Sequence, residues 1–234
     1  MSLIGQFLEL SVSTEDIRES ADFWTRLGLA QAVTGDTWRH RYAVFTDGSL
    51  FVGIHEYAFE SPAFTFVRPG LAARLPALAE AGLEFVFAKT SDEEFNEAGF
   101  RDPDGHMVAL LEARTFSEPG DPPASLAGPF AHFALTTADV GGGLDFWADL
   151  GFAASEADGR GDVAGHGLAL SLDPGARGRP PVAVFSADSV AAARERILAA
   201  GLTPGPLRAF EADADGFELV SPEGLRLRVS GAGG

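Results

Sequence analysis

Cysteine is absent from the 234 residues, and basic residues are scarce. Without a thiol, the chain cannot form disulfides, use thiolate catalysis or hold zinc or iron–sulfur clusters through cysteine. Lysine and arginine total 17 against 34 aspartate and glutamate residues, giving a formal net charge of −17 at pH 7. A field of this sign repels nucleic-acid phosphates and anionic membrane surfaces. We therefore expect neither nucleic acid nor a membrane as a partner.

Long hydrophobic runs are also missing, although 46% of the residues are hydrophobic. A membrane-spanning helix needs roughly 18 consecutive apolar residues. The first ten residues, MSLIGQFLEL, lack the basic flank and the cleavage site of a signal peptide. The sequence therefore predicts a globular protein of the cytoplasm, long enough for one large domain or two small ones.

The chain repeats itself. Residues 22–30 (DFWTRLGLA) return as residues 145–153 (DFWADLGFA), with six of nine positions identical at an offset of 123. The turn DPDG at 102–105 returns as SPEG at 221–224, at an offset of 119. The difference of four between the two offsets indicates one deletion in the second copy.

The boundary between the copies is a stretch rich in proline. Residues 115–129 contain four prolines, which exclude both a helix and a paired strand. We predict an N-terminal domain over 1–114, a linker over 115–129 and a C-terminal domain over 130–234.

Each copy is predicted to contain two βαβββ modules, an α+β arrangement. Alternation of apolar and polar residues predicts strands, and a 3.6-residue period predicts helices. In the first copy the expected strands are 7–13, 30–33, 39–46, 50–57, 63–67, 83–88, 95–100 and 107–112, with helices over about 15–27 and ending before Gly82. Pro76 is a misfit that would delay the start of the second helix. The second copy is expected to follow suit, with strands at 130–136 and 182–186, helices ending at Leu150 and spanning 190–200, and further strands to Leu172 and Val229.

This pattern resembles the vicinal oxygen chelate superfamily, which includes glyoxalase I, extradiol dioxygenases, fosfomycin resistance enzymes and bleomycin-binding proteins. The resemblance rests on the paired βαβββ modules, the Phe-Trp helix ending in Leu-Gly, and the DPDG turn before a final strand. It implies two glyoxalase-like open-barrel domains in tandem, each with a concave pocket. It also implies a divalent metal held by a His on the first strand, residues on the fourth and fifth strands, and a Glu four residues past the turn glycine.

Few of these implied metal positions carry a ligand. In the first copy they fall at Glu9, Gly53, Ala63 and Ala109, and His55 follows Gly53 by two residues. In the second copy they fall at His132, Ala169, Val182 and Arg228. A metal needs three or more protein ligands, and a fixed arginine repels it. We therefore expect no metal of the family type and no other cofactor, although an atypically bound divalent ion stays open.

Glu9 and His55 are the candidate catalytic residues. An isolated carboxylate on a concave sheet face could be a general base or an anchor for a cationic group; alternatively, Glu9 is simply exposed to water at the mouth of a wide pocket. His55 could divide acid and base roles with Glu9, or it could be a satisfied histidine near the end of a strand.

The candidate ligand-binding residues are Glu9, Trp38, His55, Met107, His132 and Arg228. His132 and Arg228 should face one cavity and would suit a carboxylate or phosphate, or they merely line a collapsed polar pocket. Trp38 precedes a strand in the basic run Trp38–Arg41 and could rim the first pocket or lie in an exposed loop. Trp24 and Trp147 are expected in the core.

Three functions are compatible with the sequence. The first is metal-independent binding of a small, possibly cationic molecule by a monomer or homodimer. The second is an isomerase, lyase or dioxygenase that uses Glu9 with His55, or an atypically bound metal. The third is a structural or regulatory protein with vestigial pockets.

Overall fold

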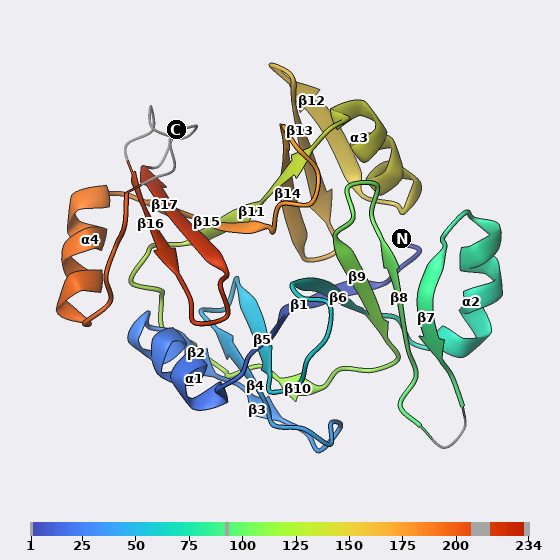
Figure 1. The fold of residues 1–234 in the computed structure, drawn as a ribbon, viewed down its shortest axis with the longest axis horizontal. Helices are drawn as coiled ribbons and strands as arrows, with labels where there is room; N and C mark the ends of the chain where they lie inside the picture. Colours follow the sequence, from blue (N-terminus) through green and yellow to red (C-terminus); the bar gives the residue numbers. More distant parts are fainter. Residues whose placement is uncertain (1, 92–93, 207–215, 232–234) are drawn as a thin grey trace. The chain divides into compact units, whose positions relative to one another are not determined.

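The protein is described by a computed structural model that covers residues 2–91, 94–206 and 216–231. By packing, the chain divides into two compact units (Figure 1). Unit 1 comprises Met1–Ser11, Glu60–Thr115 and Leu135–Pro180, and unit 2 comprises Val12–Phe59, Phe116–Ala134 and Pro181–Gly234. Each unit thus takes sequence from both copies. The predicted domain boundaries, at residues 114 and 130, are based on the sequence repeat and not on packing, and they stay a prediction.

Unit 1 contains strands of two sheets. Strands β1 (Gln6–Ser13, mostly in this unit), β6 (Ala63–Val67), β9 (Met107–Leu111), β8 (Glu97–Arg101) and β7 (Phe85–Lys89) are neighbours in that order, and β6 runs parallel to β9. Strands β12 (Ala153–Ala157), β13 (Arg160–Gly165) and β14 (Leu168–Pro174) form antiparallel neighbours. The helices of the unit are α2 (Leu71–Glu80) and α3 (Val140–Asp149), and α3 packs on β12–β14.

Unit 2 contains the remaining strands and helices of both copies. Strands β2 (Ala30–Gln31), β4 (Tyr42–Thr46) and β5 (Phe51–His55) are antiparallel neighbours, and β3 (Val33–Thr34) pairs with β10 (Phe116–Ser117). Strands β11 (Phe130–Thr137, mostly in this unit), β15 (Val182–Ala187), β17 (Arg226–Gly231) and β16 (Gly216–Val220) follow one another, with β15 parallel to β17. Helix α1 (Ile17–Arg26) packs on β4 and β5, and α4 (Val190–Ala199) packs on β16 and β17.

The strand orders confirm the predicted α+β fold, with three complete βαβββ modules and a fourth whose described residues contain β15, α4, β16 and β17. In both copies the second module begins with a strand parallel to its own last strand, β6 with β9 and β15 with β17. Gly205 forms an isolated bridge to Glu218, and the neighbouring residues 207–215 lie outside the described part. The sheets remain open, with β7 and β16 at their edges.

The first helix of each copy begins with the same capping residue, an aspartate. Asp16 accepts a hydrogen bond from the backbone N–H of Arg18 at 2.8 Å, and Asp139 accepts one from Gly142 at 3.0 Å. Each carboxylate accepts a hydrogen bond from a backbone N–H that has no partner inside the helix. Its negative charge also interacts favourably with the positive, N-terminal end of the helix dipole. The helices they begin, α1 and α3, both span ten residues.

Some expected element boundaries are wrong. Helix α2 begins at Leu71 and continues through Pro76, so proline does not delay its start. The strand expected at 30–33 is broken between β2 and β3, and β4 begins at Tyr42 rather than at residue 39. The stretch 115–129 does contain a short paired strand, β10, because its prolines begin only at residue 119. The described helices are each ten residues long, and none combines the length and hydrophobicity needed to cross a bilayer.

Trp24 and Trp147 lie in the core, as predicted, with 0% and 1% of their surface exposed. Trp24 also donates a hydrogen bond from Nε1 to Oε1 of Glu223 at 3.1 Å. Within unit 2, therefore, a helix of the first copy is bonded to the last hairpin of the second copy.

Candidate functional site

An array of rings extends the β4–β5 hairpin of unit 2. We call it the aromatic–histidine cluster and define it as Trp38, His40, Tyr42, His55, Tyr57 and Phe59. Tyr42 and His55 are direct partners in the register of β4 and β5. Because side chains on one face of a strand recur every second residue, the ring-bearing residues 38, 40 and 42 meet 55, 57 and 59 as the hairpin continues.

His40 lies between two aromatic faces. Its ring stacks on Trp38 with centroids 5.7 Å apart and planes at 22°, and on Tyr57 with centroids 5.1 Å apart and planes at 18°. Near-parallel stacking at this spacing places the electron-rich ring faces against the imidazole, which attracts positive charge at that position.

His55 completes the cluster from the end of β5. Its Nδ1 lies 2.9 Å from Nε2 of His40, a hydrogen-bond distance. Its ring contacts Tyr42 at a centroid distance of 4.4 Å and Phe59 at 5.4 Å. His55 is 6% exposed, whereas Tyr57 is 57% exposed, so the cluster runs from the interior of unit 2 to its surface.

The hairpin extension beneath the rings is fixed by main-chain and ionic contacts. The N–H of Glu56 donates to the carbonyl of Arg41 at 2.9 Å, and the side chains of the same two residues form an ion pair. These two contacts hold together the segments on both sides of the hairpin that carry the rings.

Glu9 lies in unit 1 and is buried. Only 1% of its surface is exposed, so the alternative of a water-exposed carboxylate is wrong. Its Oε1 accepts a hydrogen bond from Ser11 Oγ at 2.9 Å, and Ser11 Oγ lies 2.6 Å from Thr65 Oγ1. The chain thus supplies hydroxyl groups to a carboxylate that would be costly to bury alone. His55 belongs to unit 2, and its pairing with Glu9 stays a prediction.

The residues around Glu9 do not fit the metal that the resemblance implies. Glu9 is opposite Thr65 in β6, and Thr65 is opposite Ala109 in β9, so these three residues form one row across the sheet. Ala109 occupies the position where the resemblance implies a glutamate, and its methyl side chain cannot bind a metal. Met107, the other ligand-binding candidate of this unit, begins β9 two residues before Ala109 and lies on the same face. Among the described residues, no three acidic or histidine side chains gather as a metal site.

The second copy brings two more candidates onto one sheet face. His132 in β11 and Arg228 in β17 are both direct partners of Val184 in β15, so they flank it on the same side. Arg228 is also opposite Glu218, which holds the neighbouring Arg226 through Nε at 2.8 Å and through a second guanidinium nitrogen. His132 and Arg228 therefore lie on one face of the sheet, and a cavity between them stays a prediction. This face carries a cation at the position where the resemblance implies a metal-binding glutamate.

Comparisons with solved structures agree on the fold. The chain superposes on catechol 2,3-dioxygenase with a TM-score of 0.62 and 13% identity, covering 99% of this chain and 90% of that one. Homoprotocatechuate 2,3-dioxygenase from Arthrobacter globiformis gives 0.65 and 16% over 98% and 80% of the two chains. The Mn(II)-bound glyoxalase from Novosphingobium aromaticivorans gives 0.60 and 15% over 97% and 82%. The chain has the fold of these dioxygenases and this glyoxalase. No family model and no curated protein matches the sequence itself.

This fold was predicted, but four members of the aromatic–histidine cluster were not. Sequence reasoning singled out Trp38 and His55 and overlooked His40, Tyr42, Tyr57 and Phe59. The signal was present, because rings recur every second residue on both sides of the Asp47-Gly48 turn. A hairpin through this turn places the two series opposite each other.

Proposed function

We propose that this protein, which has a glyoxalase-like fold, binds a small molecule on the aromatic–histidine cluster, without a divalent ion such as the Mn(II) of the similar glyoxalase. The observation that carries the proposal is the stacking of His40 between Trp38 and Tyr57 while it is hydrogen-bonded to His55. Protein sites for small molecules combine apolar rings with a few polar groups that fix orientation. The cluster has this composition.

The ligand class follows from charge and ring chemistry. Aromatic faces attract cations, the ion pair with Glu56 offsets the charge of Arg41 in the basic run, and the net charge of −17 draws cations toward the protein. The two imidazoles add hydrogen-bonding nitrogens. We infer a flat or aromatic ligand that carries an amine.

A thermal-shift series with three matched probes tests this proposal. Benzylamine, benzyl alcohol and benzoate share a ring and differ in charge, and we expect stabilisation to fall in that order. Trp38→Phe and Tyr57→Ala should weaken the response to benzylamine, whereas Trp147→Phe in unit 1 should leave it unchanged. Equal responses to the three probes, or none, would refute the proposal.

A second candidate function is enzymatic: acid–base catalysis by an isomerase or lyase, or dioxygenation by O2 with an atypically bound divalent metal. It is favoured by the 2.9 Å contact between His40 and His55, because one ring must donate the proton that the other accepts. The test is turnover of catechol and homoprotocatechuate, the compounds in the names of the neighbours, with and without added Mn²⁺. Activity that survives both His55→Gln and Glu9→Ala in folded protein would remove this mechanism.

A further inference from the structure

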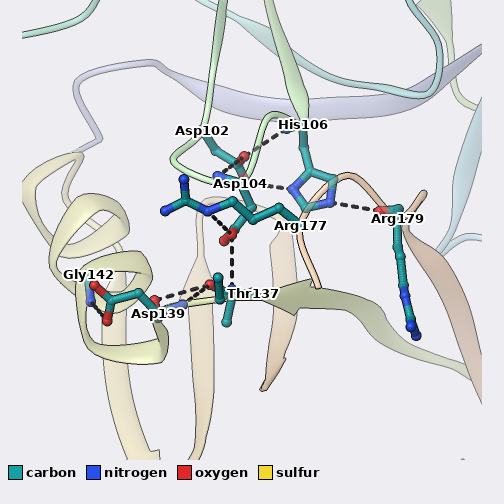
Figure 2. Close-up of polar contacts among 9 residues, drawn as sticks. Asp102, Asp104, His106, Thr137, Asp139, Gly142, Arg177 and Arg179 are labelled. Atoms are coloured by element: carbon teal, nitrogen blue, oxygen red, sulfur yellow. Dashed lines mark hydrogen bonds and ion pairs between the residues drawn. The ribbon is translucent and has the colours of Figure 1, made fainter. Parts of the chain in front are cut away.

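A buried turn in unit 1 is organised by one carboxylate. Asp102 Oδ1 accepts hydrogen bonds from the backbone N–H groups of Asp104 at 3.0 Å and His106 at 2.8 Å, and Oδ2 lies 2.8 Å from Nδ1 of the His106 ring (Figure 2). Asp102 and His106 are each 7% exposed. This turn joins β8 to β9, and none of its residues is among the site residues predicted from the sequence.

The other ring nitrogen of His106 bonds to a distant part of the chain. Nε2 lies 3.1 Å from the carbonyl oxygen of Arg179, in the segment between β14 and β15 (Figure 2). Both partners of the ring, a carboxylate and a carbonyl, accept hydrogen bonds. A neutral imidazole has one N–H and can satisfy only one of them, whereas the imidazolium has two.

We propose that His106 is a proton-dependent clasp, which in its imidazolium form ties residue 179 to the 102–106 turn and on deprotonation releases it. Arg179 is one residue before Pro180, where the chain leaves unit 1. The clasp therefore fixes the exit of the chain from this unit.

The charged groups around the ring favour the imidazolium. Asp104 Oδ1 accepts a hydrogen bond from the N–H of Ala138 at 3.1 Å and lies 3.3 Å from Nε of Arg177. The Arg177 side chain is 60% exposed, so solvent screens its charge more than that of the buried Asp104, and Figure 2 shows the Arg179 side chain extending away from the His106 ring. Two carboxylates thus act on the ring, Asp102 in contact and Asp104 nearby.

These surroundings set the direction of the pKa. Burial lowers the pKa of His106, but the hydrogen bond and charge of Asp102, the carbonyl of Arg179 and the charge of Asp104 together raise it above its usual value. A raised folded-state pKa means that the stabilisation is complete below about pH 6.5, the usual value for an unfolded histidine, and is lost as the pH rises through the folded pKa. The clasp accordingly opens on the alkaline side.

The decisive measurement is a titration of the full chain by long-range ¹H–¹⁵N spectroscopy of the histidine rings. We expect both ring nitrogens of His106 to stay protonated above about pH 6.5, the usual pKa of an unfolded histidine. A His106 midpoint at or below about pH 6.5 would overturn the proposal. Because the measurement is made on the unmodified chain, it does not depend on a variant that folds.

Release of the segment can be read by limited trypsin cleavage of the Arg177–Gly178 bond, normalised to a peptide substrate. Between about pH 6.5, the usual pKa of an unfolded histidine, and the folded pKa, the cleavage rate should rise by up to about tenfold per pH unit, as expected for loss of one proton, and it should level off above the folded pKa. His106→Gln should remove this dependence, and His166→Asn, which tolerates the positive φ at that position, should retain it. A pH profile that is the same in His106→Gln and the unmodified chain would also overturn the clasp.

Discussion

The imidazole rings of His40 and His55 are joined by a contact of 2.9 Å between Nε2 and Nδ1, inside a layer of aromatic rings. A histidine pair of this kind has a definite proton arrangement, since one nitrogen donates and the other accepts. Replacement of either ring therefore changes the other.

This coupling can be measured by a double-mutant cycle. His40→Phe keeps the stacking on Trp38 and Tyr57 but removes the hydrogen bond, and His55→Phe does the same from the other side. We expect an interaction energy of about 0.5–3 kcal/mol from urea unfolding, the range for residues in direct contact. Additive effects would show that the contact adds nothing to stability. Tyr57→Phe, at the exposed end of the cluster, is the matched control and should change little.

Metal content is the second prediction. Two of the implied metal-ligand positions are Ala109, in the same row across the sheet as Glu9, and Arg228, in the same row as His132. Neither side chain supplies a metal ligand. We expect metal analysis after purification without an affinity metal to find less than one divalent ion per chain. A stoichiometric ion would contradict this, and the same measurement on Glu9→Gln would show whether Glu9 holds it.

The third prediction concerns the buried ion pair between Glu218 and Arg226, whose side chains are 8% and 12% exposed. Glu218→Gln leaves a desolvated guanidinium without its charge partner and should cost about 3–5 kcal/mol in the free energy of unfolding. The double variant Glu218→Leu/Arg226→Met removes both charges and should recover most of this loss. A single variant as stable as the unmodified chain would mean that water already reaches the pair.

The fourth prediction is the acid response of an exposed pair in unit 1. The hydrogen bond from Arg101 lowers the pKa of Glu60, and the charge of Arg101 adds to this effect. A lowered folded-state pKa means that the stabilisation is present above the unfolded pKa and is lost as the pH falls through the folded value. Because both side chains are about half exposed, the effect should be small and vanish at high salt. Comparison of Glu60→Gln with the unmodified chain across acidic pH checks this, and a large salt-resistant difference would disagree.

The fold could be predicted because its determinants are local and occur twice. The helix-capping residues Asp16 and Asp139, and the buried Trp24 and Trp147, stand at one constant offset, and each acts on its own helix. Local chemistry of this kind is readable from sequence alone.

The site was predicted only in part because its contacts are not local. Thr65 supplies its hydroxyl group to the Glu9 network from 54 residues beyond Ser11, and no pattern near Glu9 announces it. His106 finds its second acceptor 73 residues away, at Arg179. The burial of Glu9 and the role of His106 depend on packing between modules, which hydrophobic periodicity does not encode.

The hydrogen bond from Trp24 to Glu223 has a consequence for biosynthesis, because the two residues are 199 positions apart. At a synthesis rate of about 5–20 residues per second, the acceptor appears roughly 10–40 s after the indole. Throughout this interval α1, β4 and β5 lack the part of unit 2 that follows residue 180. The earliest-made module therefore emerges with incomplete packing, and its helix gains the Glu223 partner only when synthesis of the chain is nearly finished.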